Sequence, residues 1–322
     1  MKILVIGCGS IGKVHARSVI ALGHELAVMD QNRERAESLA VETQAGACFY
    51  DEKSAYDWKP EVVIIATPNH LHLAGAKKAL ENGCHVLIEK PVSNSLEGLE
   101  NFARQASSGN LHVNVVSNMR FHPAIEVMRD NLNKIGKVYY VRSYYGNYLP
   151  NMRPQDDYRK LYCARRETGG GVILDAIHEI DYLLWLFGDV DGVNSDRAKL
   201  SDLDIDVEDF ANLVLSHRSG VKSVITMDYL RQYKRRGCEI IGSEGMIIWE
   251  SEGKQPEACK VRLFESKDRK WTMLYETDNL DNTPPYVNMM RNFLDSIHGG
   301  AARLQTVDDA KTRLAVTLEA LG

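Results

Sequence analysis

Apolar residues follow two different patterns along this 322-residue chain. In the first third, short runs rich in Val, Ile and Leu alternate with longer segments of helix-like composition. Short β-rich runs separated by helices are typical of a parallel sheet covered on both faces. We expect strands at 3–6, 25–29, 62–66, 86–88 and 112–116, and helices at 12–22, 33–42, 71–82 and 95–107.

After about residue 116 the candidate strands become longer and alternate between apolar and polar positions. Short turns such as 217–220 and 242–245 join several of them, as in an antiparallel sheet. A strongly apolar helix at 170–187 interrupts the series, and two more helices are expected at 286–297 and 308–321. The expected strands are 137–145, 211–216, 221–229, 236–241, 245–250, 260–265 and 271–276.

Together these patterns predict an α/β chain of two domains, which agrees with a length of about 150 residues per domain. Residues 1–120 would form a Rossmann domain with a doubly wound parallel sheet. Residues 121–322 would form an α+β domain with a large, mostly antiparallel open sheet for substrate binding and oligomerisation. Its last helix could pack back on the first domain.

Composition and charge narrow the class of protein. The net charge of −5 argues against a nucleic-acid partner, which would need a basic face. No apolar run approaches the roughly 20 residues of a membrane span, and the first apolar run is too short for a signal peptide. Six scattered cysteines without a C-x-x-C pair indicate buried thiols in a reducing compartment. We therefore expect a cytoplasmic protein.

The first candidate for chemistry is the segment Gly7-Cys8-Gly9-Ser10-Ile11-Gly12, which follows a strand and opens a helix. In that context G-x-G-x-x-G is the fingerprint of a dinucleotide site. Gly7 would permit a tight turn, Gly9 would let the backbone approach the pyrophosphate, and Gly12 would let helix and strand pack closely. The helix N-terminus would then offer N–H groups to the phosphates.

Asp30 completes the fingerprint at the end of the second expected strand. A carboxylate at this position accepts hydrogen bonds from the adenosine ribose and repels the 2′-phosphate of NADP. Arg33 lies close enough to weaken that repulsion. We therefore expect NAD as the cofactor, with NADP as the second choice.

Three further motifs accompany this fingerprint. Ala-Thr-Pro-Asn-His-Leu-His occupies 66–72 after a strand, Glu-Lys-Pro occupies 89–91 after the next, and three glycines at 169–171 open the apolar helix. As a set, these motifs resemble the glucose–fructose oxidoreductase / inositol dehydrogenase (Gfo/Idh/MocA) family over essentially the whole chain. The resemblance implies NAD(P)-dependent oxidation or reduction of sugars, cyclitols or sugar derivatives.

The resemblance also implies site residues. Lys90 matches a lysine beside both nicotinamide and substrate, often with a cis bond to the following proline, and Glu89 matches a residue near the nicotinamide ribose. Independently, Lys90 stands at the carboxyl end of a parallel strand, where its ammonium could polarise a substrate oxygen. The positions that match the lining of the cofactor cleft are Thr67, Pro68, Asn69 and His72.

The apolar helix carries Asp175, His178 and Tyr182 at i, i+3 and i+7, so that on a continuous helix they share one stripe. A polar stripe on a buried helix needs partners or a cavity. We expect His178 to transfer a proton and Asp175 to position it or bind a hydroxyl. The family more often spaces this pair by four residues. A satisfied surface pair without catalytic function is the alternative, and a shared metal ion would lack a third ligand.

Further contacts are expected near the domain junction, where small-molecule sites are common. Asn118 could reach the cofactor and Arg120 the substrate, because they lie in a segment that resembles the family's R-F-H-P-like stretch. The loop 148–166 contains Tyr158 and Arg165 among many charged residues. It is either a wall of the active site for a polyhydroxylated or anionic substrate, or a solvated loop with internal ion pairs.

The combined expectation is an NAD(P)-dependent dehydrogenase or reductase for a sugar or sugar derivative. One alternative is an NAD-dependent glycosidase that uses a transient redox step. Another is a dinucleotide-binding regulator without catalysis. The broad antiparallel sheet, together with the family resemblance, predicts a homodimer or homotetramer.

Overall fold

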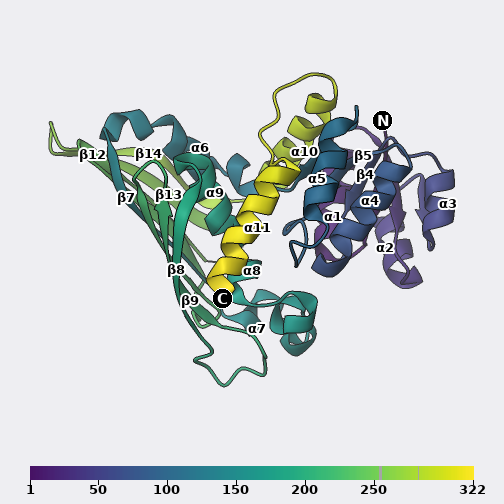
Figure 1. Cartoon of the computed structure of the whole chain (residues 1–322), viewed down its shortest axis with the longest axis horizontal. Coiled ribbons are helices and arrows are strands. Elements are labelled where there is room, and N and C mark those ends of the chain that lie inside the picture. The colour runs from purple at the N-terminus through teal and green to yellow at the C-terminus, as the bar shows by residue number, and fades with distance from the viewer. Residues whose placement is uncertain (254–255, 282) are drawn as a thin grey trace. The chain divides into compact units, whose positions relative to one another are not determined.

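The computed structural model describes residues 1–253, 256–281 and 283–322. They form two compact units (Figure 1), the first made of residues 1–121 and 283–314 and the second of residues 122–282 and 315–322. The prediction of a Rossmann sheet followed by a large, mostly antiparallel sheet is confirmed.

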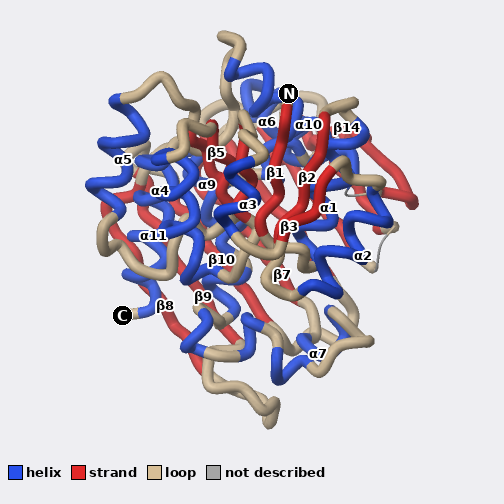
Figure 2. The backbone as a smooth tube through the Cα atoms, turned by 90° about the vertical axis from the view of Figure 1, so that its right-hand side faces the viewer, coloured by secondary structure: helices blue, strands red, loops and turns tan. Residues whose placement is uncertain are grey.

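In the described residues of the first unit, six parallel strands lie in the order β3-β2-β1-β4-β5-β6. The strand order reverses between β1 and β4, and ligands of such sheets bind at this switch point, beyond the carboxyl ends of the strands. Figure 2 shows strands of this sheet among the helices around them. The strands are β1 (Lys2–Ile6), β2 (Glu25–Met29), β3 (Ala47–Phe49), β4 (Val62–Ile65), β5 (His85–Ile88) and β6 (Val113–Val115).

The core of the first unit combines both ends of the chain. Ile3 and Val5 of β1 are fully buried, and so are Met289 and Phe293 of α10 in the same apolar cluster. The segment 283–314 therefore belongs to this unit because its apolar side chains complete the core. Its helices are α1 (Ser10–Ala21), α2 (Arg33–Thr43), α3 (Glu52–Asp57), α4 (His72–Glu81), α5 (Leu99–Ser108), α10 (Thr283–Ile297) and the start of α11 (Val307–Leu321).

The second unit contains, in its described residues, eight strands in the order β14-β13-β12-β11-β7-β10-β9-β8. The pairs are antiparallel except for β7 and β10, which run parallel. Buried and partly exposed residues alternate along β9 and β12, as expected for a sheet with one packed face. The strands are β7 (Val138–Gly146), β8 (Val190–Ala198), β9 (Phe210–His217), β10 (Lys222–Asp228), β11 (Arg235–Gly242), β12 (Gly245–Glu252), β13 (Glu257–Glu265) and β14 (Lys270–Leu280).

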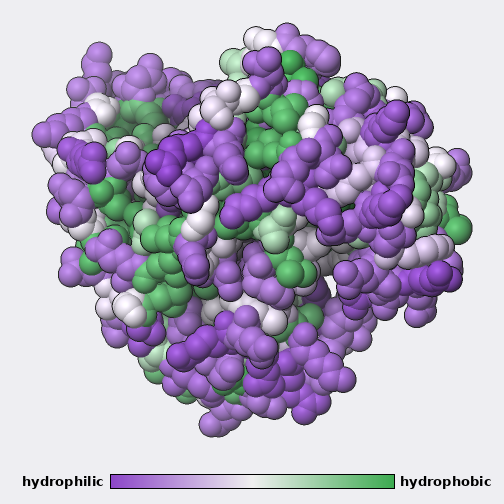
Figure 3. Space-filling model, turned by 45° about the vertical axis from the view of Figure 1, so that its right-hand side comes forward, coloured by the Kyte–Doolittle hydropathy of each residue, from purple (hydrophilic) through white to green (hydrophobic). Residues whose placement is uncertain are grey.

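Short helices and turns complete the second unit and the connections. Their bounds are α6 (Pro123–Asp130), α7 (Leu149–Met152), α8 (Val172–Asp175) and α9 (Ile177–Phe187), with 3-10 turns η1 (Asn69–Leu71), η2 (Asn118–Phe121), η3 (Leu132–Ile135), η4 (Tyr158–Lys160), η5 (Tyr162–Ala164) and η6 (Arg166–Thr168). Hydrophilic residues cover most of the face drawn in Figure 3. None of the helices built from described residues has both the length and the hydropathy to cross a membrane.

The single helix expected at 170–187 is wrong, because the chain breaks it in two. Ala176, between α8 and α9, has φ −93° and ψ 24° instead of helical values. The predicted stripe shared by Asp175, His178 and Tyr182 therefore does not exist. Asp175 ends α8, His178 lies in the first turn of α9, and Tyr182 is fully buried.

A buried ion pair fastens α9 to the sheet of the second unit. Glu179 has no exposed surface, and its Oε1 forms an ion pair with Nη2 of the Arg236 guanidinium at 2.6 Å. Its second carboxylate oxygen accepts hydrogen bonds from the hydroxyls of Ser143, at 2.9 Å, and Tyr182, at 2.8 Å. The Tyr182 hydroxyl thus forms hydrogen bonds on the side of α9 that faces the sheet. This explains why Tyr182 is buried while His178 is partly exposed.

Replacing Glu179 by Ala should destabilise the protein strongly, because the Arg236 charge would stay buried without its carboxylate. We expect a loss of about 3 to 5 kcal/mol in the free energy of unfolding, measured by urea denaturation. The matched control is Glu276→Ala, which breaks the exposed pair with Lys260 and should leave the urea midpoint nearly unchanged. Equal effects of the two substitutions would contradict the importance given to the buried pair.

Candidate functional site

The glycine turn after β1 contains two glycines that the fold itself requires. Gly7 has φ +100°, and a Cβ there would lie 2.5 Å from the Ala66 carbonyl oxygen. A Cβ on Gly12 would lie 1.9 Å from the Gly7 carbonyl oxygen. Both positions are therefore closed to any side chain, and their closeness fixes the start of α1 against β1 and β4.

Gly9 differs from its neighbours because it faces open space. Nothing lies within 4 Å of the position that its Cβ would take, and its backbone is extended. Its lack of a side chain therefore serves no packing within the protein and leaves the backbone open to a ligand. Ser10 and Ile11 begin α1, whose N-terminus has no side-chain cap, so its first N–H groups can bind an anion.

Asp30 is held beside this turn by two backbone groups. Its Oδ2 accepts from the Cys8 N–H and its Oδ1 from the Asn32 N–H, both at 2.8 Å. A carboxylate has lone pairs for about two further bonds, so ribose hydroxyls can still be accepted. Arg33, at the start of α2, is exposed and lies over the ring of Tyr50 at 4.5 Å from its centroid.

Two buried polar atoms near the strand ends have no hydrogen-bond partner among the described residues. They are Oγ1 of Thr67, after β4, and Oδ1 of Asn118, after β6. Buried polar atoms in proteins nearly always have a partner, so these two fit contacts with a bound ligand. Pro68 is exposed and Asn69 buried in the same segment. These residues and the open Gly9 fit a dinucleotide.

His72 makes contacts within the protein that the sequence did not indicate, and its place in the lining of the cofactor cleft stays a prediction. It is buried, and its Nδ1 and Nε2 each lie 2.7 Å from a backbone carbonyl oxygen, of Pro91 and of Thr67 respectively. Both ring nitrogens are thus occupied within the protein, and the side chain ties two loops together. Burial lowers the pKa of His72, while the two carbonyl oxygens oppose this shift.

Glu89 and Lys90 follow β5, and the Lys90–Pro91 peptide bond is cis. Glu89 is buried, with Oε1 2.7 Å from Nε2 of His15 and Oε2 accepting from the Lys90 N–H at 3.0 Å. Burial alone would raise the pKa of Glu89, but the hydrogen bond and charge of His15, with the charges of Lys90 and His72, lower it. Lys90 itself is partly exposed.

His15 was missed at sequence level, although a signal for it exists. On α1 it lies in one stripe with Gly12, Ala16 and Val19, on the buried side of the helix. A histidine in an otherwise apolar stripe needs a buried partner. That partner, Glu89, is 74 residues away in the chain.

Arg120 makes a contact within the protein that the sequence did not indicate. It is 3% exposed, and its Nη1 donates to the Arg303 carbonyl oxygen at 3.0 Å. The Arg303 guanidinium in turn donates to the Arg120 carbonyl oxygen and lies over the Phe121 ring. These contacts favour a structural function for Arg120, and its contact with substrate stays a prediction.

In the second unit, Asp175 and His178 stand out by their exposure. The structure describes the whole stretch 171–184, and these two are its only residues that are not buried. Asp175 Oδ1 accepts a hydrogen bond from the hydroxyl of Tyr162. Burial, together with the nearby Asp175 charge, raises the pKa of Tyr162 well above its usual value. A carboxylate and an imidazole are thus partly exposed on an otherwise buried segment.

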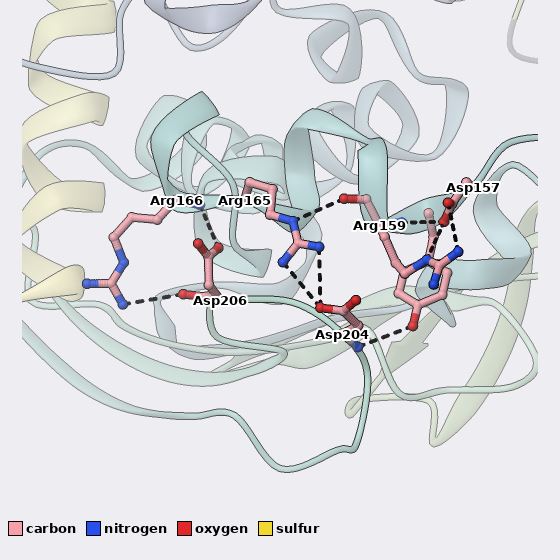
Figure 4. Close-up of polar contacts among 7 residues, drawn as sticks. Asp157, Arg159, Arg165, Arg166, Asp204 and Asp206 are labelled. Carbon is pink, nitrogen blue, oxygen red and sulfur yellow. Dashed lines mark hydrogen bonds and ion pairs between the residues drawn. The ribbon is translucent and has the colours of Figure 1, made fainter.

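The loop 148–166 makes ion pairs within itself and with Asp204, and hydrogen bonds with Asp206 (Figure 4). Arg159 donates to both oxygens of Asp157, at 2.8 and 2.9 Å. Arg165 reaches Asp204 at 3.3 Å, and the Tyr158 hydroxyl accepts from the Asp204 N–H at 3.2 Å. These contacts favour the interpretation as a loop with internal ion pairs, and substrate contacts of Tyr158 and Arg165 stay predictions.

The described residues contain no group of three or more His, Cys, Asp or Glu side chains placed to hold a metal ion. The described cysteines form no disulfide, and five of them are buried.

Two family models match the chain. The GFO/IDH/MocA model described as an oxidoreductase family with an NAD-binding Rossmann fold matches residues 1–117. The model of the GFO/IDH/MocA C-terminal domain matches residues 131–248. The two matches correspond to different units of the structure.

Curated relatives include enzymes that act on sugars and cyclitols. The 1,5-anhydro-D-fructose reductase of Ensifer adhaerens is 26% identical over 92% of this chain and 87% of its own length. The inositol 2-dehydrogenase of Rhizobium meliloti is 26% identical over 97% of this chain and 93% of its own length. The UDP-N-acetylglucosamine 3-dehydrogenase of Acidithiobacillus ferrooxidans is 33% identical, but the match spans 40% of this chain and 41% of that protein.

Solved structures share the fold over nearly the full length. A levoglucosan dehydrogenase in complex with NADH has a TM-score of 0.85 at 21% identity, covering 99% of this chain and 95% of that one. An oxidoreductase from Agrobacterium radiobacter in complex with NAD+, L-tartaric acid and magnesium has a TM-score of 0.85 at 19% identity, covering 100% and 95%.

The contrast between Gly9 and Gly12 gives a test of the nucleotide site. Gly9→Ala should fold normally, because its Cβ meets open space, but should weaken NAD binding roughly tenfold or more, since the methyl group would occupy the space of the ligand. Gly12→Ala should lower the thermal midpoint, because its Cβ would clash with the Gly7 carbonyl. Differential scanning fluorimetry and NAD titration measure the two effects. Unchanged NAD affinity in Gly9→Ala would argue against this site.

Proposed function

The chain belongs to the GFO/IDH/MocA oxidoreductase family, and on this premise we propose that it transfers a hydride between NAD(P) and a hydroxyl-bearing carbon of a sugar, cyclitol or sugar derivative. The observation that carries the proposal is the partial exposure of Asp175 and His178 on an otherwise buried segment. Reductases and dehydrogenases of an anhydrosugar, an inositol and a nucleotide sugar are among the relatives.

The chemical functions follow from the side chains. In the oxidation direction, His178 accepts the proton of the substrate hydroxyl, as a histidine suits proton transfer near neutral pH. Asp175, fixed by Tyr162, binds a neighbouring hydroxyl or orients the imidazole. The Lys90 ammonium stabilises negative charge on the reacting oxygen. When bound, the nicotinamide supplies the acceptor for the hydride.

The same proposal includes NAD as the preferred cofactor. Support comes from Asp30, whose carboxylate is fixed at the end of β2 beside the glycine turn. The exposed Arg33 is a candidate to receive a 2′-phosphate if that carboxylate is removed.

We also propose a homodimer or homotetramer that uses the sheet of the second unit. Support comes from large apolar side chains exposed on β7 and β14, namely Tyr139, Tyr140, Trp271 and Met273. The scattered cysteines, five of them buried, favour a reducing compartment and hence a cytoplasmic location.

The catalytic assignment predicts large losses of turnover. Lys90→Met and His178→Ala should each lower kcat roughly 100-fold or more, measured as the change in nicotinamide absorbance with the best substrate from a panel of sugars, uronic acids and nucleotide sugars. The exposed Lys267→Met and His298→Ala are matched controls that should keep normal turnover. Near-normal turnover in both test variants would overturn the assignment. Release of a sugar without net NADH would favour the glycosidase, and NAD binding without turnover the regulator.

The cofactor assignment predicts a shift in preference. Asp30→Ser should raise the ratio of NADP to NAD affinity roughly tenfold or more, because it removes the charge that repels the 2′-phosphate. The double variant Asp30→Ser with Arg33→Ala should lose most of that gain. Fluorescence titration of both cofactors measures the ratios. An unchanged ratio in Asp30→Ser would show that another residue sets the preference.

A further inference from the structure

We propose that His15 is a positioning residue that holds the Glu89 carboxylate, which in turn holds the backbone of Lys90. The inference rests on the proposed function, because it gives His15 a task in placing the lysine assigned to the reacting oxygen. His15 does this from α1, the helix whose N-terminus would bind the pyrophosphate.

The contacts form an unbroken chain within the first unit. Nε2 of His15 lies 2.7 Å from Oε1 of Glu89, and Oε2 of Glu89 accepts from the Lys90 N–H at 3.0 Å. His15 has no exposed surface and Glu89 is 4% exposed, so water does not compete for these bonds. Because Glu89 accepts through both oxygens, the His15 bond sets the plane in which the carboxylate meets the Lys90 amide.

The proton in this contact lies on Nε2 of His15. The facing atom is a carboxylate oxygen, which only accepts, and Nδ1 of His15 is buried without a hydrogen-bond partner among the described residues. His15 therefore acts as a donor to Glu89 through Nε2.

Helix α1 can hold this contact rigidly because its start cannot move away from β1. Gly12, three residues before His15, contacts the Gly7 backbone so closely that no Cβ fits between them. On the other side of Lys90, His72 binds the Pro91 carbonyl oxygen at 2.7 Å. Histidines at α1 and at the first residue of α4 thus hold the backbone on both sides of the lysine.

Removing His15 should move Lys90 without closing the nucleotide site. His15→Leu deletes the donor, and the buried carboxylate must then find another partner or take up a proton. His15→Gln places an amide N–H at nearly the reach of Nε2 and should restore the contact. Ser18→Ala is the matched control, since Ser18 is buried on the same helix and bonds only its own helix backbone at Val14.

In kinetics, we expect His15→Leu to lower kcat roughly 10- to 100-fold, while KM for the sugar and Kd for NAD change less than about threefold. His15→Gln should recover kcat to within about threefold of the wild type, and Ser18→Ala should match it. Wild-type kcat in His15→Leu would overturn the proposal. So would losses in His15→Gln as large as in His15→Leu, or a fall in NAD affinity that accounts for the whole effect.

A second measurement uses the cofactor-free protein. Glu89 faces His15, Lys90 and His72. Burial would raise its pKa, but the hydrogen bond and charge of His15, together with the charges of Lys90 and His72, lower it. A carboxyl with a lowered pKa stabilises the fold above its usual pKa and loses that contribution as the pH falls. The stability difference between wild type and His15→Leu should therefore be largest at neutral pH and shrink below about pH 5. Urea unfolding from pH 7 to pH 4 measures it.

The two measurements separate this inference from the proposed function. If the wild type turns over no sugar with either cofactor, the proposed function fails, and the unfolding series still decides whether His15 and Glu89 are coupled. A difference that does not vary with pH would overturn the coupling. A difference that shrinks with falling pH, together with normal kcat in His15→Leu, would support the contact but overturn its function in positioning Lys90.

Discussion

The close approach of Gly12 to the Gly7 carbonyl is the constraint on which the first unit depends. It allows α1 to begin directly against β1, which leaves the Gly9 backbone open and aims uncapped N–H groups beyond the strand ends. The same approach fixes His15, one turn along α1, at the distance where it meets Glu89. The same contact between Gly7 and Gly12 thus determines both the access of a ligand to the Gly9 backbone and the proposed placement of Lys90.

In the second unit, the corresponding constraint is the one that keeps Asp175 and His178 partly exposed on a buried segment. The buried Glu179 and Arg236 hold α9 on the sheet, and Glu208 accepts the N–H groups of Val172 and Ile173 at the start of α8. With both helices held from within, the break at Ala176 leaves Asp175 and His178 accessible. Their presentation therefore comes from tertiary contacts rather than from one helical stripe.

How far the sequence predicted these features depends on the range of the interaction behind each one. The glycine turn and five of the six described strands of the parallel sheet follow from adjacent residues, and these were predicted. The stretch 172–187 is apolar with no internal Pro or Gly, so local preference favoured one helix, and the Glu208 contacts from 35 residues away were invisible. The three-residue β3 and the largely polar, exposed β8 lacked the apolar pattern of a strand. The substrate contact of Arg120 was expected from the resemblance of its segment, and the contact with Arg303, 183 residues further along, could not be seen in the sequence.

The first unit takes part of its core from the end of the chain, and this has a consequence for biosynthesis. Met289, Met290 and Phe293 complete the apolar cluster built on β1. The core of residues 1–121 therefore lacks these side chains while the ribosome translates the second unit. The nascent Rossmann sheet therefore keeps apolar surface exposed until α10 has left the ribosome. A fragment that ends before Thr283 would keep that surface permanently, and would be a natural client for a chaperone.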